Sequence, residues 1–432
     1  MSISQHFIQQ CSAFQSASAL SDREVKRWVI ALSGGLDSMV LLDLAHRLLP
    51  AKSVVAVHVN HQQQATAKQW QIFCALQCAQ RNIAYFPFVT SPKSSSEQAL
   101  RDARYACFGE FLQINDCLLL GHHAIDQAET VLFRLVRGAG SKGLAAMPVS
   151  RELFAGQLFR PLLTVAKKEL QAHAKKSLEW VEDPSNQSLA YDRNYIRHKV
   201  IPPLLERWPK AGEQIALSAQ LLAQEHRVLQ DYLAEDVGKL SSTCRFDLQK
   251  WSCYSEAKAL LLLKFWLTKH TQCSVSRKQL QRVVGEVIHS RVGSKGFCQL
   301  GDYRAMRYRD QLHLIDQTII VQPWPILEIA AQDYSLTHGI LSFAVTDLGI
   351  VWREGMYLQS RRAGMSITVL GGVKKKLKNI FQEHNIAPWL RDKWPILMYG
   401  EQIVAIPGIC ISDDWLYKTE KKSLIQPQWQ PL

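Results

Sequence analysis

The sequence predicts an α/β protein in which a doubly wound parallel sheet is followed by a helical middle domain and a small mixed α/β C-terminal domain. Strand-like and helix-like segments alternate through the first half, as in parallel sheets covered by helices on both faces. Helical segments without strand patterns follow, and short alternating strands occupy the rest. A chain of 432 residues also exceeds the roughly 100–200 residues of one ordinary domain.

The first half begins with a β-α-β unit. Residues 28–32 are a short β-rich run, residues 38–49 have helical spacing, and residues 53–59 are continuous and β-branched. Four more elements are expected in order: a helix over 65–81, a strand over 83–89, a helix opened by the capping pair Ser94 and Glu97, and an apolar strand over 117–120.

Shifts in composition indicate the domain boundaries. After the Pro202-Pro203 pair, Gln- and Leu-rich helical segments run from Glu213 to about Ile288. Short strands are expected from Phe297, and the Gln-Pro-Trp-Pro run at 322–325 is typical of a linker. We therefore expect domains over 1–215, 216–320 and 321–432.

The sequence predicts a folded cytoplasmic protein. A hydrophobic fraction of 47% with 21% charged residues argues against a disordered or fibrous chain. The N-terminus lacks the pattern of a secretory signal, and the longest apolar stretch, 260–267, is far shorter than the ~20 residues that span a bilayer. The ten cysteines form no C-x-x-C pair, which argues against a metal or redox site.

The net charge of +13 is spread along both halves of the chain. A basic surface of this extent suits a polyanion larger than a nucleotide, because neutralising its phosphates releases counterions. Solubility alone is the alternative explanation.

A phosphate-binding loop is expected between the first strand and the following helix. Two glycines allow a tight turn, and the helix N-terminus offers unpaired N–H groups to phosphate oxygens. The loop lacks the lysine of a G-x-x-x-x-G-K-[ST] motif, which argues against ordinary phosphoryl transfer. A plain turn with a helix cap is the alternative. The expected nucleotide-binding residues are Ser33, Gly34, Gly35, Leu36, Asp37 and Ser38, with Asp37 as the simplest Mg²⁺ ligand.

Two imidazoles and a carboxylate follow the strand over 117–120. His122, His123 and Asp126 come after Gly121, where an open parallel sheet places its ligands. A lone histidine is more often structural, but this combination is hard to explain by packing.

These motifs resemble known enzymes. The Ser33–Ser38 hexapeptide after a strand resembles the Rossmann-like PP-loop ATP pyrophosphatases, which implies cleavage of ATP to AMP and pyrophosphate. The run from His122 resembles the tRNA(Ile)-lysidine synthetase family, whose pattern is His-His-x-Asp-Asp-Gln-x-Glu-Thr. This chain departs from the pattern at Ile125, where the first Asp is expected. We therefore expect Asp126 to act alone, and Ile125→Asp to be neutral or mildly beneficial.

Further segments are similar to the same family. They include Glu97-x-x-x-Arg101-x-x-Arg104-Tyr105, the glycine-rich run 137–144, Arg160-Pro161-Leu162-Leu163 and Arg193-Asn194-Tyr195-Ile196-Arg197. The resemblance is thinner towards the C-terminus, where the lysine cluster alone would usually be a solvated face. The residues that the resemblance assigns to tRNA or substrate are Arg104, Arg137, Lys142, Arg193, Asn194, Arg197, Arg361, Arg362, Lys374, Lys375 and Lys376.

The resemblance implies a ligase that uses ATP and Mg²⁺. Its substrates would be free L-lysine and an isoleucine tRNA with a CAU anticodon, whose wobble cytidine becomes lysidine through an adenylated intermediate. Asp37, His122, His123 and Asp126 would be catalytic, and Asp37 and Asp126 would bind the metal. The first domain would hold ATP, and the other two would bind tRNA.

Two other readings remain open from the sequence. The first is another PP-loop enzyme. A tRNA thiolase would require a cysteine pair or cluster near the loop, and an amidotransferase would require a glutaminase segment; neither is present. An inactive tRNA-binding module is favoured only by Ile125. The sequence does not indicate the oligomeric state.

Overall fold

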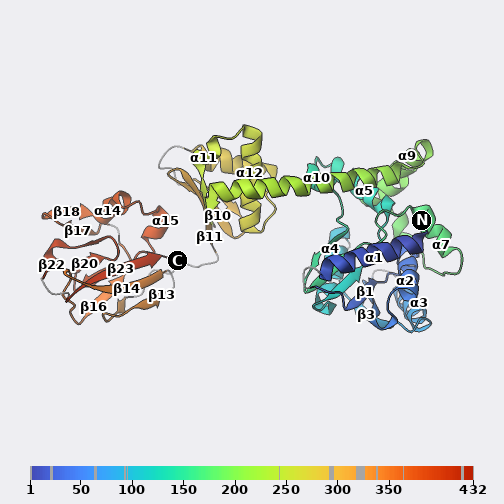
Figure 1. The fold of residues 1–432 in the computed structure, drawn as a ribbon, viewed down its shortest axis with the longest axis horizontal. Helices are drawn as coiled ribbons and strands as arrows, with labels where there is room; N and C mark the ends of the chain where they lie inside the picture. Colours follow the sequence, from blue (N-terminus) through green and yellow to red (C-terminus); the bar gives the residue numbers. More distant parts are fainter. Residues whose placement is uncertain are drawn as a thin grey trace. The chain divides into compact units, whose positions relative to one another are not determined.

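The computed structural model describes residues 2–19, 23–62, 66–91, 94, 96–242, 244–290, 296–317, 326–336, 339–362, 364–419 and 423–431 (Figure 1). The linker expected at 322–325 lies outside these residues, as does the first residue of the helix expected over 65–81. The chain divides into two compact units, Met1–Tyr232 and Leu233–Leu432.

The first unit is built on a six-stranded sheet with the order β3-β2-β1-β4-β6-β5. All neighbouring strands pair in parallel except β5, which is antiparallel to β6. The strands are β1 (Arg27–Ala31), β2 (Val54–Asn60), β3 (Ala84–Val89), β4 (Asp116–Leu119), β5 (Ser150–Leu153) and β6 (Gly156–Phe159).

Both faces of the strands β1, β2 and β4 are buried, which explains their continuous apolar runs. Trp28 and Ile30 pack on one face with residues of α1, α2 and α7, whereas Val29 and Val57 pack on the other with Phe108 of α4. The predicted doubly wound sheet is therefore confirmed. The helices of this unit are α1 (Ile3–Ala19), α2 (Leu36–Leu48), α3 (Ala67–Ala79), α4 (Glu97–Phe111), α5 (Ala124–Leu135), α6 (Ser141–Leu144), α7 (Lys167–Ala174), α8 (Asp192–Tyr195) and α9 (Ile201–Arg207), and α10 (Ala211–Leu240) begins in this unit and ends in the second. Short turns are η1 (Ala51–Ser53), η2 (Pro184–Gln187) and the π-helical η3 (Ile196–Val200).

The boundary expected near residue 215 falls inside the long helix α10, and the three-domain division stays a prediction. Within the second unit, α11 (Leu248–Ser252), α12 (Glu256–Thr271), α13 (Arg277–Arg282) and the π-helical η4 (Val283–Ile288) accompany a five-stranded antiparallel sheet. Its strands are β7 (Ser241–Ser242), β8 (Arg245–Asp247), β9 (Phe297–Leu300), β10 (Tyr303–Tyr308) and β11 (Gln311–Asp316).

The C-terminal part consists of small antiparallel sheets around one apolar core that includes Phe381, Trp394 and Leu397. Among the described helices, none is long and apolar enough to cross a membrane. The C-terminal elements are β12 (Leu327–Glu328), β13 (Tyr334–Leu336), β14 (Gly339–Thr346), β15 (Leu348–Gly349), β16 (Met356–Gln359), β17 (Ser366–Val369), β18 (Val373–Lys376), α14 (Leu377–Glu383), α15 (Pro388–Arg391), β19 (Ile396–Tyr399), β20 (Gln402–Ile406), β21 (Cys410–Ile411), η5 (Asp413–Trp415), β22 (Tyr417–Lys418) and β23 (Leu424–Pro431).

Candidate active site

The candidate site lies where the order of the parallel strands reverses. The chain passes from β1 to β2 on one side, while β4 pairs with β1 on the other. The loop after β1 and the turn after β4 therefore meet at the carboxyl edge of the sheet, which is where open α/β sheets bind ligands.

Ser38 closes the loop after β1. Its hydroxyl accepts hydrogen bonds from the Gly34 N–H (3.1 Å) and the Ser33 hydroxyl (3.0 Å), and it donates to the Gly35 carbonyl (2.9 Å). Gly34 has a φ of +86°, and a Cβ there would lie 3.1 Å from the Cys74 sulfur. The turn therefore depends on glycine for both its conformation and its space.

Gly121 brings the second segment against this loop. A Cβ at this position would lie 2.8 Å from the carbonyl oxygen of Asp37, so no side chain fits. The close approach of the two backbones places Asp37 beside the start of α5.

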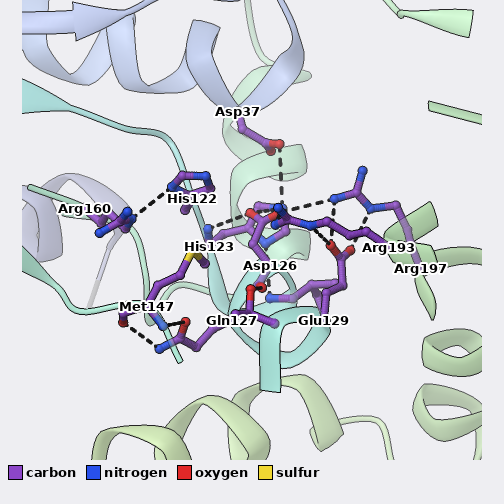
Figure 2. A network of polar contacts seen from close by, with 12 residues as sticks. Asp37, His122, His123, Asp126, Gln127, Glu129, Met147, Arg160, Arg193 and Arg197 are labelled. Carbon is purple, nitrogen blue, oxygen red and sulfur yellow. Dashed lines mark hydrogen bonds and ion pairs between the residues drawn. The ribbon is translucent and has the colours of Figure 1, made fainter. Parts of the chain in front are cut away.

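His123 and Asp126 cap α5 and face Asp37 (Figure 2). Asp126 Oδ2 accepts from the His123 N–H at 3.0 Å, and His123 Nδ1 accepts from the Ile125 N–H at 3.2 Å. The proton of the neutral ring is then on Nε2, which lies 3.7 Å from Asp37 Oδ2 and 3.5 Å from Asp126 Oδ2. The structure thus brings together three of the predicted catalytic residues.

Asp37 has an oxygen that fits a cation. Its Oδ1 is buried and has no hydrogen-bond partner within the described part of the chain. Burial raises the pKa of this carboxyl, and the neighbouring His123 offsets the rise only in part. The described residues contain no cluster of three or more His, Cys, Asp or Glu suited to a metal. One such carboxylate still fits Mg²⁺, which commonly uses one or two carboxylates together with substrate phosphates.

His122 is held as a neutral donor. Burial lowers its pKa to about 3, although Asp126 acts in the opposite direction. Arg160, which is 2% exposed, donates from Nε to His122 Nδ1 at 3.1 Å. The ring proton is therefore on Nε2. Arg160 belongs to a run that resembles the family, but its contact with His122 gave no sequence signal because 38 residues separate them.

Arg193 and Arg197 lie in a partly buried ion network. Glu129 is fully buried, and its oxygens accept from Arg193 Nε at 3.1 Å and from Arg197 Nε at 2.6 Å. Arg197 also reaches Asp126 Oδ1 at 3.3 Å. Burial would raise the pKa of Asp126, but His123, His122 and Arg193 hold it well below its ordinary value. Asp126 is therefore ionised.

The glycine-rich run 137–144 is fixed at both ends by side chains. Gln127 donates to the Met147 carbonyl (2.9 Å) and accepts from its N–H (3.0 Å), and Arg134 donates to the Gly143 carbonyl (2.8 Å). Arg137 stacks on Phe133 at 3.9 Å and pairs with Asp192 at 3.3 Å. Lys142 and Arg104 are exposed, whereas Asn194 donates to the Ser188 carbonyl at 2.9 Å.

Ile125 packs away from the catalytic carboxylates. It belongs to an apolar cluster with Ala128, Ile196 and Ile201, and its Cδ1 would lie 2.4 Å from a Cβ added to Gly212 of α10. This packing argues against the expectation that Ile125→Asp is neutral or beneficial, because the new carboxylate would replace an apolar contact between α5 and α10.

We expect Ile125→Asp to lower the free energy of unfolding by about 3 kcal/mol, since a charge enters an apolar cluster and packing is lost. Thermal unfolding followed by circular dichroism measures the effect. Ile125→Val is the control and should cost about 1 kcal/mol. An Ile125→Asp protein that melts with the wild type would contradict this packing.

The C-terminal candidates lie in the second unit. Lys374 and Lys376 are exposed on one face of β18, and Lys375 on the other pairs with Glu383 at 3.0 Å. Arg361 pairs with Asp392 at 2.8 Å, and Arg362 is exposed. Two of these five side chains, Lys375 and Arg361, are therefore already paired with carboxylates.

Comparisons with known proteins cover nearly the whole chain. Residues 4–204 match the model of the PP-loop domain, residues 246–313 that of the TilS substrate binding domain, and residues 356–429 that of the TilS substrate C-terminal domain.

Curated relatives match along the same length. A tRNA(Ile)-lysidine synthase of Legionella pneumophila (strain Paris) is 34% identical over 90% of this chain and 93% of its own. The proteins of that name from Vibrio vulnificus (strain CMCP6) and Enterobacter sp. (strain 638) are 34% and 33% identical, over 90% and 94% of this chain and 93% and 97% of their own. On these matches, the chain belongs to the tRNA(Ile)-lysidine synthase family.

Proposed function

We propose that this protein is an ATP-dependent ligase that attaches free lysine to C2 of the wobble cytidine in the CAU anticodon of an isoleucine tRNA. The product is lysidine, and AMP and pyrophosphate are released. One observation carries the proposal: in a chain of this family, Asp37 of the phosphate loop faces the His123–Asp126 pair across the carboxyl edge of the sheet.

In the first step, the C2 oxygen of cytidine attacks the α-phosphorus of ATP, and pyrophosphate leaves. The loop from Ser33 to Ser38 would bind the phosphates through its N–H groups and the N-terminus of α2. Asp37 would hold Mg²⁺, which would neutralise the charge developing on the departing pyrophosphate. The Nε2–H groups of His122 and His123 would donate to phosphate oxygens. The base must leave its stack to reach this site.

In the second step, the ε-amine of lysine attacks C2, the C2–O bond breaks, and AMP leaves with that oxygen. A free lysine amine has a pKa near 10.4, so it must lose a proton before it attacks. His122, His123, Asp126 and Glu129 are the candidate acceptors. Both histidines have an occupied acceptor nitrogen, and the Glu129 oxygens are filled by arginines.

Asp126, which is ionised, would therefore bind the lysine ammonium, and the proton that the amine loses would pass to solvent water, because the low pKa of Asp126 makes this carboxylate a poor base. Its oxygens already accept from the His123 N–H and from Arg197, so a role as second Mg²⁺ ligand requires it to share them. We propose that Asp126 orients the amine and His123, and that its part in metal binding is secondary to that of Asp37.

We assign tRNA binding to basic side chains in both units. Arg104, Arg137 and Lys142 would contact RNA beside the active site, while Arg193, Arg197 and Asn194 would position the site through their internal contacts. Arg361, Arg362 and the lysines of β18 would hold the RNA backbone elsewhere. As tRNA is found in the cytoplasm, we propose a cytoplasmic protein.

Replacing Lys374, Lys375 and Lys376 with Ala should raise the KM for tRNA and leave the KM for ATP unchanged. The slope of log K for tRNA binding against the logarithm of the salt concentration should become smaller by about one unit or less per lost phosphate contact. Filter binding at several salt concentrations measures both. The triple Lys→Arg protein keeps the charges and serves as control; if the Ala protein equals it in affinity and slope, the cluster is only a solvated face.

The first chemical step tests the proposed function. Incubation with ATP labelled on the α-phosphate, Mg²⁺ and the CAU tRNA, without lysine, should place label on the RNA. Addition of lysine should then release the label as AMP. Label that never reaches the RNA would contradict adenylation of the base.

A further inference from the structure

Four arginines gather around Tyr105 beside His122. Arg101 and Arg104 lie on α4 with Tyr105, Arg151 lies on the edge strand β5, and Arg160 follows β6. The Arg101 guanidinium carbon is 4.9 Å from the centre of the Tyr105 ring, and that of Arg151 is 5.5 Å from it. Arg101 also donates to the Tyr105 hydroxyl at 3.4 Å.

These four arginines form no ion pair within the described part of the chain. Three carboxylates on the same elements have other partners: Glu97 lies 3.9 Å from Arg193, Asp102 accepts from Gln98 at 2.7 Å, and Glu152 pairs with Arg23 at 2.7 Å. Guanidinium groups this close repel one another, so the cluster gains from binding an anion.

The Tyr105 hydroxyl reports the same positive field. Burial alone would raise its pKa, yet Arg101, Arg160 and Arg151 together lower it below the ordinary value. The guanidinium groups of Arg101 and Arg151 lie over the Tyr105 ring, so the ring holds these cations together around a site that suits a phosphate.

The position of the cluster favours a phosphate of the RNA backbone over a phosphate of ATP. ATP has its own site at the loop after β1. Arg160 donates directly to His122, and in the view of Figure 2 it lies on the opposite side of the histidine pair from Arg197. Arg104 and Arg151 are exposed, and Arg101 and Tyr105 are partly so. An extended polyanion can therefore reach the cluster from the surface.

We propose that Arg101, Arg104 and Arg151, around Tyr105 and backed by Arg160, bind a backbone phosphate of the RNA next to the reacting cytidine. This inference rests on the proposed function, and it gives the site a means of holding the flipped nucleotide. The arginines fix the backbone on one side of His122, and the base then extends towards His123 and Asp37.

The double variant Arg101→Gln/Arg151→Gln should weaken tRNA binding by on the order of tenfold or more, because it removes charged hydrogen bonds. The salt slope should fall by about 0.7 per lost phosphate contact, the value for a single strand. The KM for ATP should not change. Lys26→Gln/Lys52→Gln removes two charges at the amino ends of β1 and β2, the opposite edge of the same sheet, and should bind tRNA like the wild type.

A charge-deletion cycle locates the phosphate. A tRNA with a neutral methylphosphonate linkage beside the wobble cytidine should bind the wild type as weakly as normal tRNA binds the double variant. The double variant should not distinguish the two RNAs. Arg101→Lys/Arg151→Lys keeps both charges and should retain most of the tRNA binding. This control shows whether the loss in the Gln variant comes from the missing charges or from misfolding.

Additive losses in this cycle, or unchanged tRNA affinity, would overturn the inference. A raised KM for ATP or weaker inhibition by pyrophosphate in the double variant would also overturn it, by showing that the cluster serves the nucleotide. The tRNA affinities and the salt slopes are binding measurements that need no turnover. Their failure is therefore distinct from failure of the proposed function, which is measured by adenylation and lysine transfer in the wild type.

Discussion

Asp37→Asn is expected to reduce pyrophosphate release on the order of 10²- to 10³-fold while leaving tRNA affinity nearly intact, as losing one group that stabilises developing charge does. The buried Oδ1 has no partner among the described residues, and Asn keeps the side-chain volume but removes the negative charge a cation needs. Pyrophosphate release and filter binding with tRNA measure the two properties separately.

The control for this change is Asp102→Asn on α4, whose carboxylate accepts only from the Gln98 side chain in the described structure. It should release pyrophosphate at the wild-type rate. Near-normal release by Asp37→Asn would remove Asp37 from the metal site and would leave the loop as a structural turn. Raising the Mg²⁺ concentration should rescue Asp37→Asn only in part.

Asp126→Asn is expected to reduce turnover on the order of 10²-fold or more, since it removes a positioned charge from the reacting centre. The carboxylate is held ionised between His123 and Arg197, and an amide cannot balance both. Single-turnover lysine transfer from pre-adenylated tRNA isolates the second step, where we expect most of the loss.

Asp192→Asn is the matched control because its carboxylate is exposed and pairs only with Arg137 in the described structure. An exposed pair of this kind contributes little to stability, about 1 kcal/mol at most. Its turnover should equal that of the wild type. A fully active Asp126→Asn enzyme would show that Asp126 only caps α5.

Strand periodicity predicted the N-terminal sheet closely. The expected strands at 28–32, 53–59, 83–89 and 117–120 are each within one residue of β1, β2, β3 and β4. The strands β1, β2 and β4 are buried on both faces, so their apolar runs are unbroken, whereas β3 lies at the edge of the sheet and is mostly exposed. The β5–β6 hairpin was not found, because two four-residue strands give too short a pattern.

The sequence likewise shows some of the site residues and misses the contacts of others. Asp37, His122, His123 and Asp126 are recognisable because each follows a strand end, where chemistry is expected. The contacts of Arg160, Arg193 and Arg197 cannot be recognised in the sequence, because their partners lie 38 to 71 residues away. A charged residue in a turn is also usually exposed, so the sequence does not indicate that these side chains are partly buried. Only the fold shows that two of these arginines balance a fully buried Glu129.

The family motif did not indicate which way the side chain of Ile125 faces. Aligned with the family pattern, it occupies the place of a carboxylate, which suggested a defect in the site. The helix turns this position towards Gly212 and the apolar cluster instead, so the side chain contributes to packing between α5 and α10. Sequence spacing alone did not reveal that face, because the partner helix lies about 90 residues further on.

Transfer of labelled lysine to RNA tests the central claim most directly. The wild-type protein, incubated with ATP, Mg²⁺, labelled lysine and an isoleucine tRNA bearing a CAU anticodon, should place label on the RNA in amounts equal to the AMP released. The same tRNA with uridine in place of the wobble cytidine should stay unlabelled. Release of AMP and pyrophosphate without label in the CAU tRNA would contradict the assignment of lysine as the substrate.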